Sequence, residues 1–218
     1  LRMFSRIGKV TNQVIHQLAQ LMPNGVKGKS FLLRGTVPLE HRYVGNAKIF
    51  DEREKKNLLA SYNANHPFQN VTEPIYQQTV GRNPVDRMQL IDINTWLSGD
   101  LLLNADRTTM AHSLELRTPF LDKEVFKVAR EIPAHLRLAH GTTKYILRKA
   151  VEGIVPENVI YRKKLGFPVP IRHWLKDEMY DWALTIIRES QTEHLLNKGY
   201  IEDLLINHRI GKIDYSRK

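Results

Sequence analysis

One segment of the sequence constrains the fold more than any other, because it interleaves charges with apolar side chains. It covers residues 101–122, LLLNADRTTMAHSLELRTPFLD, and Thr118-Pro119 predicts a turn inside it. The candidate charges within it are Asp106, Arg107, Glu115 and Arg117. Burying a charge is unfavourable unless the charge is paired. We therefore expect these side chains at or near a core boundary, either as ion pairs that tie a helix to the turn or as the polar wall of a substrate pocket.

Helical periodicity dominates the rest of the chain. Apolar residues recur three and four positions apart, and proline and glycine mark the breaks. We expect helices, with their caps, at residues 11–22, 51–62, 75–81, 85–97, 101 onward, 123–132, 142–152, 171–189 and 199–208. Ser98-Gly99-Asp100 should separate two of them. No segment alternates cleanly between apolar and polar residues, and no repeat is visible, so the sequence predicts one mainly helical unit.

Some of these helices have a recognisable start. Asp51 followed by Glu54 is an acidic form of the capping box, in which each side chain accepts a hydrogen bond from the backbone N–H of the other residue. Lys55 lies four residues after Asp51 and can pair with it. Asp122 is the expected N-cap of the helix that follows it. Thr11 or Asn12 is the expected cap of the first helix, at residues 11–22.

Lys144 is the first cationic candidate for a functional residue. Thr142 or Thr143 is expected to cap a helix that carries Lys144 in its first turn. The N–H groups and the dipole of a helix start favour an anion, so a lysine there can meet a phosphate. The alternative is a solvated side chain, because a lone surface charge is a weak signal.

A second basic run, Arg162-Lys163-Lys164, precedes Leu165-Gly166-Phe167. Glycine would let the backbone turn there, and phenylalanine would anchor the loop. From composition alone this run is typical of a solvated loop.

Other residue classes give no catalytic pattern. The nine histidines never show the four-residue spacing of a helical zinc pair, so no metal site is expected. No nucleophile-elbow motif supports Ser/His/Asp catalysis. The basic residues are scattered rather than arranged in a stripe with interleaved aromatic residues, which disfavours nucleic-acid binding.

Composition bounds the class of protein. A chain of 218 residues with 42% hydrophobic content can bury one core. Its formal net charge of +10 favours polyanions, which include nucleic acids and nucleotides. We see no cysteine, no secretory signal and no apolar stretch of membrane length, so we expect no membrane association and a cytoplasmic location.

Four blocks of the sequence together resemble one enzyme family. They are DRTTMAHSLELRTPFLD (106–122), GTTKYILRKA (141–150), IVPENVIYRKKLGFPVPIRHWL (154–175) and, more weakly, GVKGKSFLLRGTVPLEHRYVGNAKIF (25–50). Their order and spacing are similar to those in the carboxyl-terminal part of the synthetase domain of glutamine-hydrolysing asparagine synthetases. The amino-terminal block, residues 25–50, resembles the bacterial members of the family.

The resemblance implies a part in an ATP-dependent C–N ligase of the amidotransferase type. In such enzymes ATP and Mg²⁺ convert the side-chain carboxylate of aspartate to β-aspartyl-AMP, and ammonia from glutamine displaces AMP. Lys144 matches the lysine of the family that contacts nucleotide and pyrophosphate. Arg162 and Lys164 match basic positions near the synthetase site. The four charges of residues 106–117 would build or support the wall near the acyl acceptor or the ammonia path.

Two features of the family are missing from this sequence. The absence of cysteine removes the nucleophile of the glutaminase domain. No two glycines are adjacent, so the Ser-Gly-Gly-x-Asp-Ser pyrophosphate loop is missing as well. The resemblance thus implies that residues 1–218 are a single truncated fragment of a synthetase domain. The expected fold is mainly α, as the helical C-terminal portion of an α/β ATP-pyrophosphatase-type (adenine nucleotide alpha-hydrolase-like) domain.

We accordingly expect no synthetase activity from the isolated chain and no tight binding of ATP or Mg²⁺. Two alternatives remain open: a basic helical module that binds nucleic acid or a protein, or a fragment of a related amide- or lactam-forming cyclase. Apolar faces left uncovered would also allow a homodimer.

Overall fold

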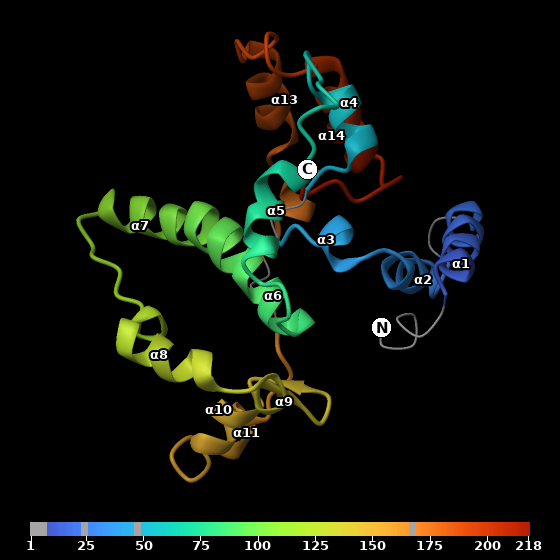
Figure 1. Ribbon diagram of the computed structural model, residues 1–218. Coiled ribbons are helices and arrows are strands. Elements are labelled where there is room, and N and C mark those ends of the chain that lie inside the picture. Colours follow the sequence, from blue (N-terminus) through green and yellow to red (C-terminus); the bar gives the residue numbers. More distant parts are fainter. Residues whose placement is uncertain (1–7, 23–25, 46–48, 166–168) are drawn as a thin grey trace. The chain divides into compact units, whose positions relative to one another are not determined.

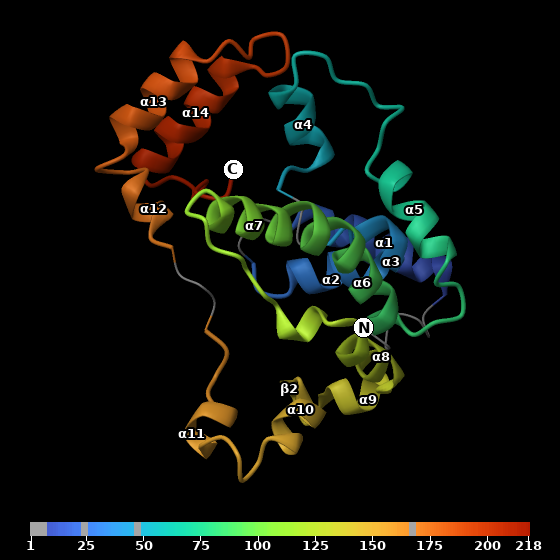
Figure 2. The ribbon, with the colours of Figure 1, turned by 90° about the vertical axis from the view of Figure 1, so that its left-hand side faces the viewer.

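The structure is a computed structural model that describes residues 8–22, 26–45, 49–165 and 169–218. Helices make up most of these residues, as Figures 1 and 2 show. The chain groups into two compact units, each built from two segments: residues 1–47 with 68–116, and residues 48–67 with 117–218. The mainly helical class expected from the periodicity is confirmed, although the sequence predicts one helical unit and the structure groups into two.

The first unit contains α1 (Lys9–Leu21), α2 (Lys29–Thr36), α3 (Leu39–Arg42), α5 (Gln69–Gln77), α6 (Pro84–Asp92), the π-helix η2 (Ile93–Leu102) and α7 (Leu103–Met110). The second unit contains α4 (Glu52–Leu58), the 3₁₀-helix η3 (Pro119–Leu121), α8 (Lys123–Glu131), α9 (Ala134–Arg137), β1 (Leu138–Ala139), β2 (Thr142–Thr143), α10 (Tyr145–Ala150), α11 (Glu157–Ile160), α12 (Ile171–Trp174), α13 (Tyr180–Glu189) and α14 (Lys198–Arg209). No helix among the described residues is both long and apolar enough to span a membrane.

The capping box at the start of α4 is confirmed. The carboxylate of Asp51 accepts a hydrogen bond from the backbone N–H of Glu54 at 2.9 Å, and the carboxylate of Glu54 accepts one from the backbone N–H of Asp51 at 2.9 Å. Lys55 pairs with Glu52 at 2.6 Å, because the carboxylate of Asp51 is engaged at the helix start. The helix ends at Leu58, earlier than the predicted residue 62.

The predicted cap at Asp122 is confirmed, and the one at Thr11 or Asn12 is wrong. Asp122 caps α8, since its carboxylate accepts a hydrogen bond from the backbone N–H of Glu124 at 2.8 Å. α1 begins at Lys9, so Thr11 and Asn12 lie inside the helix and do not cap it. α1 has no side-chain cap, which is a loss of only about 1 kcal/mol for a helix.

The expected break at Ser98-Gly99-Asp100 is wrong. α6, η2 and α7 follow one another directly, so residues 84–110 form one continuous helical run. The side chain of Asn83 starts this run by accepting a hydrogen bond from the backbone N–H of Val85 at 3.0 Å. Gly99 weakens a helix by about 1 kcal/mol relative to alanine but still donates its N–H, unlike proline. It lies in the π-helical part, where the turns are wider.

α5 also differs from the prediction. We expected a helix to start after Pro74, but the helix begins at Gln69 and Pro74 lies inside it. Proline removes one backbone hydrogen bond from a helix. The two buried side chains of α5, Thr72 and Tyr76, lie four residues apart on one face and on both sides of Pro74. Burial of this face outweighs the lost hydrogen bond.

Hydroxyl and carboxylate groups form the centre of the first unit. The hydroxyl of Tyr43 donates to the carboxylate of Asp92 at 2.5 Å, and the hydroxyl of Tyr76 donates to the backbone carbonyl of Tyr43 at 2.8 Å. Burial, and then the hydrogen bond and charge of Asp92, raise the pKa of Tyr43. Burial, and then the charge of Glu40, raise the pKa of Tyr76 to about 12. These groups join the segment after α3 to α5 and α6.

At the other end of the chain, the single helix expected over residues 171–189 is two helices, α12 and α13. The chain turns between them, where the backbone N–H of Met179 donates to the carbonyl of Trp174 at 2.8 Å. α13 packs on α14, whose predicted range is confirmed to within one residue at each end. The buried core here consists of Tyr180, Ala183 and Leu205.

One short hairpin interrupts the helices. β1 and β2 pair antiparallel, with Leu138 opposite Thr143 and Ala139 opposite Thr142. The sequence gives no strand signal here, because strands of two residues are too short to show alternation.

Candidate functional site

The hairpin, α10 and residues 161–164, which follow α11, line a cationic groove of about 750 Å³. α10 and α11 are labelled in Figure 1. Five lysines and arginines line the groove: Arg148, Lys149, Arg162, Lys163 and Lys164. Tyr145 and Tyr161 and the turn at residues 140–143 complete its lining. The structure thus brings the predicted Arg162 and Lys164 together with two cations of α10, to which the sequence analysis gave no role. Two short basic runs of the sequence thus meet in this groove.

One carboxylate lies close to the cations of the groove. Glu152 accepts a hydrogen bond from the ammonium group of Lys149 at 2.7 Å and another from the hydroxyl of Tyr161. The hydrogen bond from Lys149, followed by that from Tyr161, lowers the pKa of Glu152. The hydrogen bond to Glu152 raises the pKa of Lys149 and that of Tyr161. Lys149 is therefore partly neutralised by a neighbour from its own chain.

The other basic residues of the groove are not neutralised in this way. Arg162, Lys163 and Lys164 are exposed, and in the part of the chain that the structure describes none of them forms an ion pair. Their positive charge is available to an anion that enters the groove. Gly166 and Phe167, which we expected to turn and anchor this loop, lie outside the described residues.

Lys144 stands beside the groove, in a different local structure from the one predicted. Its neighbours Thr143 and Tyr145 both line the groove, and its own side chain is exposed. α10 begins at Tyr145, so Lys144 is the N-cap residue and does not lie in the first turn. Thr142 and Thr143 form β2 and do not cap the helix. α10 has only six residues, so the positive field at this place comes from side chains and not from a helix dipole.

The backbone of Lys144 is left-handed, with φ 58° and ψ 33°. This conformation costs a residue with a side chain about 1 to 2 kcal/mol relative to glycine, and lysine is not among the residues that tolerate it best. Strained backbone of this kind is concentrated at functional sites, where the surroundings hold it in place. Lys144 therefore stays a candidate for a functional residue in this segment.

The four charges of residues 106–117 are not at a core boundary, which corrects the expectation from the sequence. Asp106 and Arg107 belong to α7, and Glu115 and Arg117 follow it; all four side chains are exposed. The apolar residues between them are largely exposed too, with Leu114 62% and Met110 54% accessible. All four side chains are therefore accessible to solvent, and the burial that motivated the expectation of a core boundary is absent from this segment.

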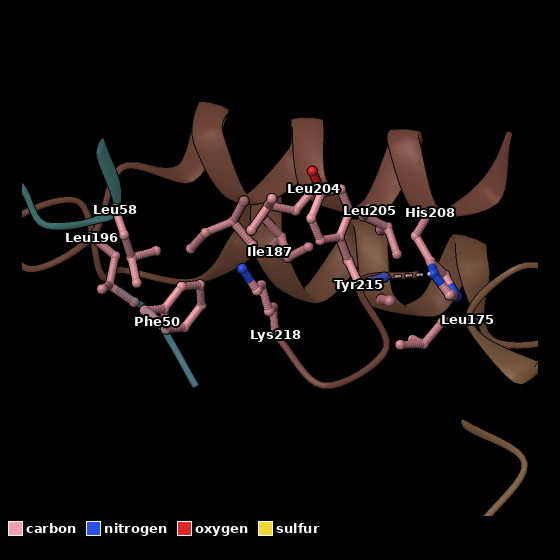
Figure 3. A pocket seen from close by; sticks show the side chains of 12 residues that line it. Phe50, Leu58, Leu175, Ile187, Leu196, Leu204, Leu205, His208, Tyr215 and Lys218 are labelled. Carbon is pink, nitrogen blue, oxygen red and sulfur yellow. Dashed lines mark hydrogen bonds between the residues drawn. The ribbon is translucent and has the colours of Figure 1, made fainter. Parts of the chain in front are cut away.

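A second cavity, of about 420 Å³, is lined by α13, α14, the segment around α4 and the C-terminal residues (Figure 3). Most of its lining is apolar, including Phe50, Leu58 and Leu204. His208 is buried, with an accessible fraction of 1%. Nε2 of His208 lies 2.8 Å from the carbonyl oxygen of Arg172, and its Nδ1 accepts from the backbone N–H of Tyr215 at 3.1 Å. Both ring nitrogens are thus engaged by backbone groups, which indicates a structural role.

Among the described residues, no group of three or more histidine, aspartate or glutamate side chains is arranged to hold a metal ion.

Comparison with known proteins assigns the family. The family model for asparagine synthase matches residues 12–218. Asparagine synthetase [glutamine-hydrolyzing] 1 of Bacillus subtilis (strain 168) is 53% identical over 218 residues, which cover 100% of this chain and 34% of the relative. A protein of Mycobacterium tuberculosis (strain ATCC 25618 / H37Rv), whose name also places it among the glutamine-hydrolysing asparagine synthetases, is 45% identical over 219 residues and likewise 34% covered.

Asparagine synthetase [glutamine-hydrolyzing] 3 of Bacillus subtilis (strain 168) is 31% identical over 156 residues, which cover 70% of this chain and 25% of that protein. No solved structure matches the chain. The chain spans about a third of the length of the first two relatives, at high identity over its whole extent. The family resemblance drawn from the four sequence blocks is confirmed: this chain belongs to the asparagine synthase family.

Proposed function

We propose that this chain is the carboxyl-terminal part of the synthetase domain of a glutamine-dependent asparagine synthetase. The observation that carries the proposal is the 53% identity to the Bacillus subtilis enzyme over the whole chain. The complete protein would activate the side-chain carboxylate of aspartate with ATP, as β-aspartyl-AMP, and would amidate it with ammonia from glutamine. It would act in the cytoplasm.

In this proposal Lys144 and the cationic groove serve the phosphate side of the reaction. Negative charge develops on the phosphates during adenylation, and cations held in place beforehand stabilise it. Lys144 would contact the phosphates directly, and Arg162 and Lys164 would raise the positive potential around them. The support from the structure is the gathering of five cations in one groove next to a lysine with a strained backbone.

Asp106, Arg107, Glu115 and Arg117 remain the proposed wall near the acyl acceptor or the ammonia path. All four side chains are exposed, and acidic and basic groups together suit the recognition of an amino acid such as aspartate, which has an ammonium group and carboxylates. No step is assigned to them individually.

Mg²⁺ belongs to the proposal for the complete enzyme only. The described residues offer no cluster of ligands for it, so no residue of this chain is assigned to the metal. We accordingly expect this chain by itself to bind ATP weakly and to be inactive.

A nucleic-acid module is the second candidate, and one observation favours it. The groove combines five cations with the rings of Tyr145 and Tyr161, which is the combination that binds single-stranded nucleic acid. The family assignment makes this the weaker candidate.

One titration separates the two functions. The amide resonances of the ¹⁵N-labelled chain are followed while pyrophosphate or a single-stranded oligonucleotide is added, at low and at high salt. The synthetase proposal expects pyrophosphate to shift Lys144 and its neighbours at about millimolar concentration, and expects no release of pyrophosphate from ATP and aspartate by the chain alone. Binding of the oligonucleotide at a concentration about a hundredfold lower, lost at high salt, would favour the nucleic-acid module. Aspartate-dependent release of pyrophosphate by the pure chain would contradict its expected inactivity.

A further inference from the structure

The left-handed backbone of Lys144 needs a cause, because nothing in a lysine side chain favours it. The angles φ and ψ of a residue fix how the peptide plane before its Cα is turned relative to the plane after it. For Lys144 the first plane carries the carbonyl of Thr143, and the second carries the carbonyl of Lys144 itself. Whatever holds both carbonyls holds the conformation of Lys144.

The hairpin fixes the chain as it enters Lys144. His140 and Gly141, at the turn, both have positive φ, of 50° and 72°, as a two-residue hairpin loop requires. Thr143 is the last paired residue of β2, opposite Leu138. Lys144 therefore follows a segment whose register is set, but the hairpin alone does not determine the peptide planes beyond it.

Arg148 contacts both of the carbonyls in question. The guanidinium Nε of Arg148 donates to the carbonyl oxygen of Thr143 at 3.1 Å. The backbone N–H of the same residue donates to the carbonyl oxygen of Lys144 at 3.0 Å, as part of α10. The side chain of Arg148 is half-buried and lines the groove.

We infer that Arg148 is the positioning residue of Lys144. It clamps the peptide planes on both sides of the Lys144 Cα, and so directs the lysine side chain from a fixed, left-handed backbone. This inference rests on the proposed function, in which Lys144 meets the phosphates. The backbone half of the clamp is made by almost any residue in a helix, so the specific contribution of arginine is its Nε contact with Thr143.

The charge and the clamp can be separated with a matched pair of variants. Arg148→Met and Lys149→Met each remove one cation from the groove. Only the first removes the contact to the Thr143 carbonyl, because Lys149 pairs with Glu152 instead. Arg148→Lys keeps the charge but replaces the planar donor with a mobile ammonium group.

The first readout is the backbone of Lys144 in the ¹⁵N,¹³C-labelled chain. A positive φ gives a strong nuclear Overhauser effect between the Hα and the amide proton of the same residue. We expect this signal for Lys144 in the unmodified chain and in Lys149→Met, and its loss in Arg148→Met. A left-handed Lys144 that persists in Arg148→Met would overturn the inference.

The second readout is the affinity for inorganic pyrophosphate, from the same spectra. We expect Arg148→Met to weaken binding about tenfold and Lys149→Met only about twofold, with Arg148→Lys in between. Equal losses in the two methionine variants would reduce Arg148 to one charge among several and would overturn its positioning role. Pyrophosphate could fail to shift the resonances of Lys144 while the left-handed signal still depends on Arg148. That result would contradict the proposed phosphate contact and leave the clamp intact.

A third readout needs no variant, which covers the case that Arg148→Met fails to fold. The Nε proton of Arg148 should exchange with water at least tenfold more slowly than that of Arg162, whose exposed side chain serves as the reference. Equal exchange rates would mean that the Nε contact is not maintained in solution, and the inference would fail.

Discussion

Nδ1 of His208 accepts a hydrogen bond from the backbone N–H of Tyr215 at 3.1 Å, so the last helix holds the segment that follows it. Since the N–H of Tyr215 is the donor, Nδ1 carries no proton, and Nε2 donates to the carbonyl of Arg172 at 2.8 Å. One buried ring thus joins α14 to α12 and to the C-terminal residues. Figure 3 shows it at one end of the apolar cavity, with Tyr215 beside it.

Replacing His208 should therefore destabilise the second unit. His208→Leu leaves the carbonyl of Arg172 and the N–H of Tyr215 without their partner, and we expect a loss of about 2 kcal/mol in the free energy of unfolding. Urea unfolding followed by circular dichroism measures it. Ile210→Ala is the control, because Ile210 follows α14 and is 58% accessible. Equal unfolding midpoints for the two variants would show that the hydrogen bonds of His208 contribute nothing.

The pair of Tyr43 and Asp92 predicts a loss of stability at alkaline pH. Burial and the carboxylate of Asp92 raise the pKa of Tyr43 above the unfolded value of about 10. A group whose pKa is raised in the folded state contributes stability below its unfolded pKa and loses that contribution as the pH rises toward its folded pKa. We expect the free energy of unfolding to fall as the pH rises above about 10, and to fall less in Tyr43→Phe.

Tyr76 adds to the same alkaline loss, because its pKa is raised to about 12. The double variant Tyr43→Phe with Tyr76→Phe should therefore show the flattest dependence. Tyr145→Phe is the control, since in the described part of the chain its hydroxyl has no hydrogen-bond partner. The same alkaline slope in all of these variants would contradict the role of the tyrosine cluster.

The strained backbone of Lys144 predicts an unusual order of stability. A protein with glycine next to a helix start is ordinarily less stable than one with alanine there, because glycine loses more conformational freedom on folding. At φ 58° the order should reverse, so we expect Lys144→Gly to be more stable than Lys144→Ala by about 0.5 to 1 kcal/mol. Urea unfolding of both variants measures the difference. An alanine variant as stable as the glycine variant would mean that Lys144 carries no strain.

Glu152 should compete with an anionic ligand for the groove. Its carboxylate is engaged with Lys149 and Tyr161, so Glu152→Gln removes an internal competitor and one negative charge. We expect pyrophosphate to bind about two- to fivefold more tightly to this variant, an effect of the size usual for an exposed charge. Glu157→Gln controls for net charge, because Glu157, in α11, is also an exposed carboxylate. The prediction fails if both variants bind pyrophosphate equally.

The helices and the family could be predicted from the sequence because both depend on local patterns. The capping box at Asp51 and the cap at Asp122 are interactions between residues two and three apart, so the sequence contains the whole of each motif. The expected helix boundaries at Ser98-Gly99-Asp100 and at Pro74 were wrong. At Pro74 the buried face of α5 outweighs one lost hydrogen bond, and Gly99 has a modest cost in a helix because it still donates its N–H.

The cationic groove could be predicted only in part. Arg162 and Lys164 came from the family resemblance, but Arg148 and Lys149 share the groove through the hairpin and the turn of α10, which no spacing rule reveals. The left-handed Lys144 has no sequence signal either, since lysine is rare in that conformation.

The most direct test of the proposed function is a chimera. Residues 1–218 replace the matching third of Bacillus subtilis asparagine synthetase 1, and aspartate-dependent release of pyrophosphate from ATP is measured with glutamine or ammonia. We expect the chimera to release pyrophosphate at a rate within about tenfold of the parent enzyme, and Lys144→Ala in the chimera to lower that rate about a hundredfold or more. A folded chimera that binds ATP but releases no pyrophosphate, or one that is indifferent to Lys144→Ala, would contradict the assignment of this chain and its lysine to the synthetase reaction.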